Sequence, residues 1–196
     1  SDPGHYLIKA GAGCGKSSTV IKQLRLLNKI KPKLKILFLA FNRSVADEIK
    51  HQVSFADVDT FHSFAMRHVS GKLSTGQEFF ILKDYKLACA NLGLPAPSRD
   101  TLEALKMALH YCISPEDETG IMEVAAKYGL SVIPSDITRL LKETINRASF
   151  SFDSVLYKFA NNLNTAVPHY DVVVVDECQD CNISRLLCLD QLLEAN

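Results

Sequence analysis

The sequence predicts an α/β fold in which a parallel sheet is interrupted by a long helical insertion. Short apolar runs alternate with amphipathic segments over the first 70 residues, as strands and helices do along a parallel sheet. Four consecutive valines at 172–175 resume this pattern near the carboxyl end. From Gly71 to about Ala166 the periodicity is helical and no strand signal of useful length occurs.

The amino-terminal elements alternate in order. Residues 6–10 are an apolar run that stops at a glycine cluster, which predicts a buried strand entering a loop. From Ser17, apolar residues recur at helical spacing until Pro32 ends the region. The pattern then predicts a buried strand at 35–41, a helix through Val45, Ile49 and Val53, a short strand at 55–59 and a helix from Thr60.

The insertion and the carboxyl end complete the predicted fold. Helices are expected at 78–92, 101–112, 121–128, 135–148 and 152–163, separated by stretches rich in Gly, Pro and Ser. Four successive valines fit a central strand that is buried on both faces. A last helix is expected at 183–193.

Composition sets broad limits on the protein class. With 196 residues, 47% of them hydrophobic and 22% charged, the chain is globular rather than disordered. It has no apolar run long enough to cross a bilayer. The formal net charge of zero gives no support for binding nucleic acid through charge alone, but a local groove could still grip single strands by stacking.

The six cysteines are irregularly spaced, which is typical of reduced thiols in an intracellular protein. The expected location is therefore the cytoplasm or nucleoid, the nucleus or, for a viral protein, the host cell. Cys178 and Cys181 form a C-x-x-C pair, but zinc would need two further ligands and the sequence has no second pair.

Residues 10–17 read AGAGCGKS, which satisfies the P-loop pattern with Ala10 in the first glycine place. Small residues let backbone N–H groups curl around a phosphate chain, and the N-terminus of the following helix favours negative charge. Lys16 is expected to reach the β- and γ-phosphates, and the Ser17 hydroxyl to ligate Mg²⁺. The predicted ATP-binding residues are Gly11, Ala12, Gly13, Cys14, Gly15, Lys16, Ser17 and Ser18.

A glycine turn that only caps a helix is the alternative. The order of strand, glycine loop, Gly-Lys-Ser and helix favours nucleotide binding instead. The sequence therefore predicts ATP and Mg²⁺ as cofactors.

An acidic cluster, DECQD at 176–180, follows the valine strand. A strand that ends in an acid delivers it to the crevice where ligands bind in open α/β sheets. Asp176 is expected to hold Mg²⁺ through water, and Glu177 to accept a proton from the attacking water. The alternative is a solvated acidic strand end. A P-loop upstream in the same sheet favours the catalytic interpretation.

Together these motifs resemble those of superfamily 1A DNA helicases of the UvrD/Rep/PcrA type. Residues 40–49 (AFNRSVADEI) resemble the family motif after the second strand, and 59–64 (DTFHSF) resemble its Thr-x-His-Ser segment. The usual second motif has Ala or Phe where this chain has Cys178. The spelling is most similar to the branch with the F-box DNA helicases and related viral or phage enzymes.

The resemblance implies a RecA-like P-loop NTPase sheet with a helical insertion subdomain. Residues 1–70 and 166–196 would form the ATP-binding lobe, called 1A in this family. Residues 71–165 would form an insertion similar to subdomain 1B, which contacts duplex and single-stranded DNA in the family.

The resemblance also implies roles for single residues. Phe41 matches an aromatic that stacks with or pockets a DNA base, and the strand-binding track would further include Asn42, Arg43, Thr60 and His62. The alternative makes Phe41 a core residue at a strand end and His62 a helix-cap partner. Gln179 would join Lys16 and Glu177 in the catalytic set by sensing the γ-phosphate, and Arg185 stands where the family often has Gln.

The implied function is that of an ATP-dependent DNA helicase or translocase, hence an ATP hydrolase. Its expected partners are single-stranded DNA or a single-strand/duplex junction, with no membrane, and a second RecA-like lobe of the same polypeptide. These 196 residues lack that lobe, which supplies charge-stabilising arginines in the family, so we expect weak ATP binding, slow hydrolysis and no unwinding.

Two other functions compete with this one. The first is a stand-alone, single-lobe ATP-dependent module that binds nucleic acid or regulates a partner without unwinding. The second is a P-loop kinase or another NTPase, for which the sequence has no acceptor-binding signature.

Overall fold

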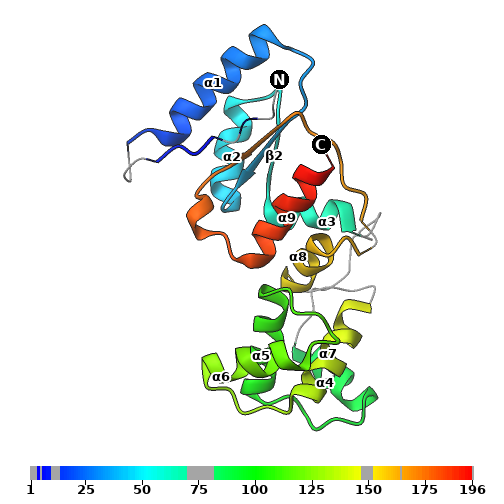
Figure 1. The fold of residues 1–196 in the computed structure, drawn as a ribbon. Coiled ribbons are helices and arrows are strands. Elements are labelled where there is room, and N and C mark those ends of the chain that lie inside the picture. Colours follow the sequence, from blue (N-terminus) through cyan, green and yellow to red (C-terminus); the bar gives the residue numbers. More distant parts are fainter. Residues whose placement is uncertain are drawn as a thin grey trace. The chain divides into compact units, whose positions relative to one another are not determined.

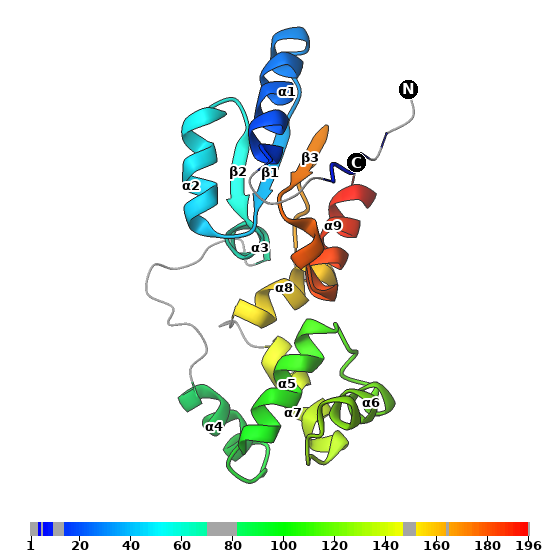
Figure 2. The ribbon, with the colours of Figure 1, turned by 90° about the vertical axis from the view of Figure 1, so that its left-hand side faces the viewer.

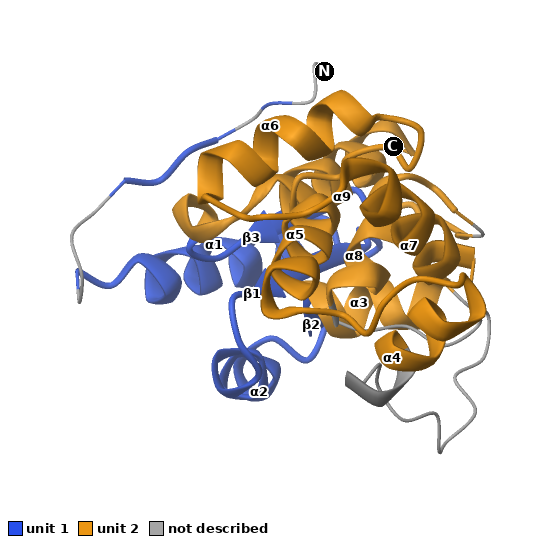
Figure 3. Ribbon diagram, turned by 90° about the horizontal axis from the view of Figure 1, so that it is seen from below, with its two compact units in different colours: residues 1–60, 170–177 blue, residues 61–169, 178–196 orange. Residues whose placement is uncertain are grey.

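The computed structural model describes residues 4, 6–9, 14–69, 82–146, 152–163 and 165–195. The chain divides into two compact units (Figure 3). Unit 1 comprises residues 1–60 and 170–177, and unit 2 comprises residues 61–169 and 178–196.

Unit 1 is built on a parallel sheet. Its described strands are β1 (Ile36–Ala40), β2 (Asp57–Thr60) and β3 (Val172–Val175), in the order β2-β1-β3 (Figure 2). Helix α1 (Lys16–Ile30) precedes β1, and α2 (Arg43–Gln52) connects β1 to β2 (Figure 1). The predicted α/β fold class is confirmed.

The core of unit 1 lies around β1, whose five residues are all buried. Alternate residues of a strand face opposite sides of the sheet, and those of one face form a cluster with α1 and α2. This cluster contains Ile21, Leu24, Ile36, Phe38, Ala40, Ala46, Ile49, Val53 and Val58. On the other face, Leu37 and Leu39 are completely buried. A strand buried on both faces explains the unbroken apolar run in the sequence.

Polar contacts join the amino ends of the strands. The carboxylate of Asp171 accepts a hydrogen bond of 2.7 Å from the backbone N–H of Lys35. The hydroxyl of Tyr170 donates to the Asp57 carboxylate at 2.9 Å. The first bond joins the amino ends of β1 and β3, and the second joins the segment before β3 to β2, at the edge away from the acidic cluster.

Unit 2 is helical throughout its described residues. Its α-helices are α3 (Phe61–Val69), α4 (Leu82–Asn91), α5 (Arg99–His110), α6 (Glu118–Tyr128), α7 (Pro134–Asn146), α8 (Phe152–Ala160) and α9 (Ile183–Glu194), and the short 3₁₀ helix η1 (Cys178–Asp180) precedes α9. One apolar cluster joins helices α4 to α8 and includes Leu105, Leu109, Ile121, Leu140 and Leu141. Each predicted helix of the insertion has a counterpart among the described residues, and α8 ends three residues early, at Ala160. Residues 78–81 and 147–148 of the predicted ranges lie outside the described residues.

The helix starts follow the expected capping chemistry. At several helix starts, a side-chain oxygen accepts a hydrogen bond from a backbone N–H of the first turn. This bond satisfies an N–H group that has no acceptor within the helix. The capping residues are Asn42 for α2, Ser98 for α5, Asp117 for α6 and Asn182 for α9.

Two predictions about strands are wrong. Residues 6–9 form no strand, and Tyr6, Leu7 and Ile8 are exposed. Strand β3 is not buried on both faces, because all four of its valines are partly exposed. The physical reason is shared: β3 is at one end of the described sheet, and no described strand pairs with its outer edge or with residues 6–9.

The predicted domain bounds remain a prediction. They assigned α3 and α9 to the ATP-binding lobe, whereas the compact units group both helices with the other helices of unit 2. Within the described residues, no helix is both long and apolar enough to cross a membrane.

Candidate functional site

The first part of the site is the start of α1. Gly15 precedes the helix with φ 76°, in the left-handed region that favours glycine, and it provides no side chain to cap the helix. The start of α1 therefore has no side-chain cap, in contrast to the four capped helices. Lys16 and Ser17 are the first two residues of this helix.

The second part of the site is the carboxyl end of β3, which carries Asp176 and Glu177. The backbone N–H of Asp176 donates to the Leu39 carbonyl at 3.0 Å, so the ladder with β1 continues up to the first acid. Lys16 Nζ lies 4.0 Å from Glu177 Oε1, and both side chains are partly exposed. The lysine of the glycine loop and the acid of the valine strand thus meet at one place in unit 1.

Ser17 and Asp176 make the next contact. The Ser17 hydroxyl lies close enough to the Asp176 carboxylate to stabilise its charged form. Burial raises the pKa of Asp176 above its ordinary value, and the neighbouring Glu177 raises it further. The hydrogen bonds from Ser17 and from the Glu177 N–H, together with the charge of Lys16, oppose this shift. The site thus holds two adjacent carboxyl groups whose mutual repulsion a bound cation would relieve.

These groups fit Mg²⁺ better than a softer metal. A serine hydroxyl and a carboxylate are hard oxygen ligands, and Mg²⁺ usually takes only one or two protein ligands beside water and phosphate. No group of three or more His, Cys, Asp and Glu side chains that could hold a metal occurs in the described ranges. The predicted metal ligands Ser17 and Asp176 therefore suit an ion that arrives with a nucleotide.

Glu177 has an unusual backbone conformation. Its φ of 51° lies in the left-handed region, which side chains other than glycine, Asn and Asp rarely adopt. Such conformations cost about 1–3 kcal/mol and cluster at active sites. The turn at Glu177 ends β3 and starts η1, which carries the exposed side chain of Gln179 in unit 2.

Four of the five predicted DNA-binding residues lie at the same edge of the sheet as the acids. Phe41 follows β1 directly and is 41% exposed. Asn42 caps α2, and Arg43 forms an exposed pair with Asp47 at 3.8 Å. Thr60 is the last residue of β2 and lies opposite Ala40. Parallel strands bring these residues together because all three strands end at one edge.

The fifth residue, His62, belongs to α3 in unit 2. Its pKa is lowered from 6.5 to about 4, mainly by burial and then by the positive charge of Arg185. At neutral pH the imidazole is therefore uncharged, so it acts as a hydrogen-bonding group rather than as a cation for phosphate.

Part of the predicted glycine loop, Ala10, Gly11, Ala12 and Gly13, lies outside the described residues. Cys14 and Ser18 are exposed on either side of Lys16. All six cysteines are free thiols.

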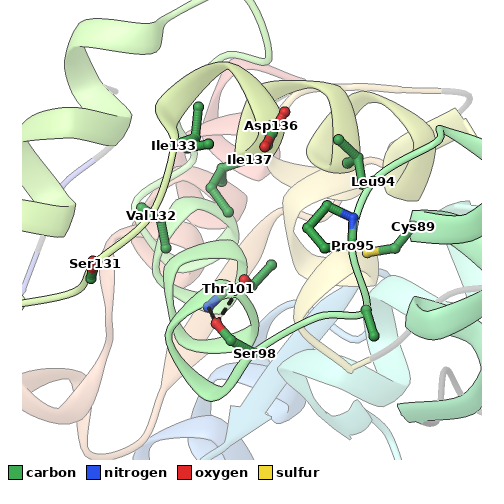
Figure 4. A pocket seen from close by; sticks show the side chains of 11 residues that line it. Cys89, Leu94, Pro95, Ser98, Thr101, Ser131, Val132, Ile133, Asp136 and Ile137 are labelled. Atoms are coloured by element: carbon green, nitrogen blue, oxygen red, sulfur yellow. Dashed lines mark hydrogen bonds between the residues drawn. The ribbon is translucent and has the colours of Figure 1, made fainter.

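A separate cavity lies in unit 2 and has a volume of about 380 Å³ (Figure 4). It is lined by residues of α4, α5, α7 and their connections, among them Cys89, Pro95, Thr101, Ile133 and Asp136. None of the predicted site residues lines this cavity, so it supports no part of the predicted chemistry.

The sequence interpretation missed the surroundings of Arg185. Its guanidinium lies 5.8 Å from the ring centroid of Phe61, at the start of α3. It also donates to the backbone carbonyl of Asp180 at 3.4 Å. No sequence signal joins these residues, because the two segments are far apart along the chain.

Comparisons with known proteins agree with this geometry at the level of a family. The sequence model of one protein family, described as an AAA domain, matches residues 2–195. A search of curated proteins finds no match.

Proposed function

We propose, from the premise that this chain belongs to the AAA domain family of P-loop NTPases, that it is the ATP-binding lobe of a superfamily 1 DNA helicase or translocase. The family membership accounts for a nucleotide-binding module. The observation that carries the finer proposal is the meeting of Lys16 with Glu177, and of Ser17 with Asp176, at the carboxyl edge of a parallel sheet.

The proposed nucleotide site uses the amino-terminal end of α1, which has no side-chain cap. The N–H groups after Gly15 and the positive end of the helix bind phosphate oxygens. Lys16, now 4.0 Å from Glu177, exchanges this partner for the β- and γ-phosphates when ATP binds. Ser17 and Asp176 would hold Mg²⁺, which neutralises charge on the phosphates.

In the proposed hydrolysis step, a Glu177 carboxylate oxygen accepts a proton from water as the water oxygen attacks the γ-phosphorus. The bond to the β-phosphate oxygen breaks, and ADP leaves with that electron pair. Gln179, two residues further along, is the proposed sensor of the γ-phosphate. The role of Glu177 as the base is supported by the position of its carboxylate, 4.0 Å from Lys16 Nζ.

Single-stranded DNA is the proposed second ligand. Phe41 offers an exposed ring at the end of β1, and aromatic stacking suits binding that tolerates any base sequence. Asn42, Arg43 and Thr60 lie beside it and would contact the sugar–phosphate backbone, with His62 as a neutral donor. Titration of a fluorescent oligothymidine tests this part: absence of any binding at low salt contradicts it.

A second RecA-like lobe of the same polypeptide is the proposed partner. Phosphoryl transfer gains about 10³–10⁵ in rate from an arginine that reaches the developing charge. Lys16 forms an ion pair with Glu177 in this chain. The resemblance to superfamily 1 helicases supports a second lobe as the source of the arginines.

Two substitutions test the nucleotide site by separating binding from turnover. Lys16→Ala should weaken the binding of a fluorescent ATP analogue in the presence of Mg²⁺, because the phosphates lose their cation. Glu177→Gln should bind nearly as well as the wild type but lose single-turnover hydrolysis, because the amide accepts no proton.

The same two substitutions at exposed positions outside the proposed site serve as controls. Lys22→Ala removes an exposed lysine from α1, and Glu123→Gln makes the same acid-to-amide change on α6; both should behave as wild type. Full hydrolysis by Glu177→Gln would place the base elsewhere. Unchanged nucleotide affinity in Lys16→Ala would contradict the phosphate site itself.

A further inference from the structure

The chain passes from unit 1 into unit 2 directly after two of the proposed ligand-binding segments. One passage follows Thr60, where α3 begins, and the other follows Glu177, where η1 begins. Within unit 1 the two strand ends lie on either side of β1: Thr60 is opposite Ala40, and the Asp176 N–H bonds to Leu39. With neighbouring strands about 4.8 Å apart, these ends are about 10 Å from each other.

Arg185, in the first turn of α9, contacts both of the segments that begin at these passages. Its guanidinium carbon lies 5.8 Å from the ring centroid of Phe61, the first residue of α3. Its Nη1 donates to the carbonyl of Asp180, the last residue of η1, at 3.4 Å. A guanidinium can make both contacts at once, since its face meets the ring and its edge carries the donors.

The surroundings of Arg185 hold it in this position. Its own N–H donates to the Asn182 side chain at 3.1 Å, and the Ser184 hydroxyl donates to the same oxygen at 3.0 Å. Phe61 is only 5% exposed, so its ring is fixed by packing. The charge of Arg185 is also felt by His62. Movement of η1 relative to α3 therefore breaks or reshapes a contact of Arg185.

We propose that Arg185 is a positioning residue that couples the occupancy of the nucleotide site to the binding of single-stranded DNA. A shift of η1 on binding of the γ-phosphate passes through Arg185 to Phe61 and His62 at the start of the DNA track. The inference rests on the proposed function, and Arg185 itself touches neither ligand. Because coupling between two binding sites is reciprocal, DNA tightens nucleotide binding by the same factor as nucleotide tightens DNA binding.

The test measures this coupling factor directly. A fluorescent oligothymidine is titrated with the chain, once without nucleotide and once with a saturating, slowly hydrolysed ATP analogue and Mg²⁺. The ratio of the two Kd values is expected to be about 5 or more for the wild type. For Arg185→Gln, which removes the charge but keeps amide donors, nucleotide affinity and nucleotide-free DNA affinity persist while the ratio falls to about 1.

Three further variants separate coupling from folding. Arg139→Gln removes an arginine of the same unit that also donates to a main-chain carbonyl, that of Leu92 at 2.6 Å, and should keep the wild-type ratio. Arg185→Lys retains the charge near Phe61 and should restore part of the ratio. Phe61→Leu keeps apolar volume, removes the ring and should lower the ratio even if Arg185→Gln does not fold.

The outcomes distinguish the two proposals. A wild-type chain that binds neither nucleotide nor DNA refutes the proposed function and this inference with it. A wild-type chain that binds both ligands, with a ratio of about 1 or a ratio that Arg185→Gln leaves unchanged, overturns the inference alone. A purely structural role for Arg185 would lower Tm in Arg185→Gln without altering the ratio, which also overturns it.

Discussion

His62 is partly buried next to Arg185, which makes it an uncharged histidine at neutral pH. The charges of His110, on α5, and Asp153, on α8, also act on it, and these two side chains form a contact of 2.7 Å with each other. Asp153 raises the pKa of His62, but burial and Arg185 outweigh it. Protonation of His62 is therefore coupled to opening of the helices packed around it.

This coupling predicts a loss of stability in mild acid. The unfolded chain binds a proton at His62 near pH 6.5, whereas the folded chain does so only near pH 4. Stability from this residue is therefore complete above pH 6.5 and is lost as the pH falls towards 4, by up to about 3 kcal/mol. Urea unfolding at pH 7.5 and 5.0 measures the effect, which His62→Asn should reduce.

A matched histidine controls for the other titrating groups. His51→Asn changes an exposed histidine at the end of α2 and should leave the pH dependence of the wild type intact. If His62→Asn shows the same loss between pH 7.5 and 5.0 as the wild type, the buried neutral imidazole is not the cause.

At the scale of elements, β1 is the centre of the described sheet and β3 is at its edge. Both strands are apolar, yet every residue of β1 is buried while the four valines of β3 keep some exposure. The site is at the ends of these strands because strand direction carries Phe41, Thr60 and Asp176 to one edge. A rigid central strand therefore positions both proposed ligand sites.

Truncation of the two strands should show this difference in the free energy of unfolding. Leu39→Ala leaves a cavity at a completely buried position and should cost about 2–5 kcal/mol. Val173→Ala should cost clearly less, because part of the removed surface already faces solvent. Denaturant unfolding gives both values, with Leu26→Ala on the exposed side of α1 as a control of about 0.5 kcal/mol or less. Equal costs for the two strands would contradict the edge position of β3.

At the scale of the whole molecule, the proposed chemistry is divided between two compact units. Lys16, Ser17, Asp176 and Glu177 lie in unit 1, while Gln179 and His62 lie in unit 2. The chain crosses between the two units after Thr60, before Tyr170 and after Glu177. In our proposal, binding of a ligand is transmitted through α3 and η1, which follow two of these crossings.

In our proposal, an arginine from the second lobe adds a factor of about 10³–10⁵ to the rate of hydrolysis. A polypeptide that carries only residues 1–196, with Lys16 beside Glu177, should therefore be a slow ATPase. A steady-state phosphate-release assay with and without oligothymidine measures this, with Glu177→Gln as the baseline. Rapid turnover that DNA stimulates strongly would contradict the need for a second lobe.

Much of the fold could be predicted from the sequence because its signals are local. Apolar runs and helical periodicity identified β1, β2, β3 and the helices of both units, since each depends on neighbours along the chain. The strand predicted at residues 6–10 failed over 6–9, and β3 was taken as buried on both faces. Both errors concern pairing at a sheet edge, which no local pattern reports.

The candidate site could likewise be predicted only as far as its signals are local in the sequence. The sequence motifs around Lys16 and Asp176 were enough to predict a shared phosphate and magnesium site, because each motif consists of consecutive residues. The sequence by itself thus determined which elements form and which residues carry chemistry. Only the tertiary structure decided that Lys16 meets Glu177, that His62 is neutral and that Arg185 joins α3 to η1. These properties depend on distance, burial and charge between segments that the chain order keeps apart.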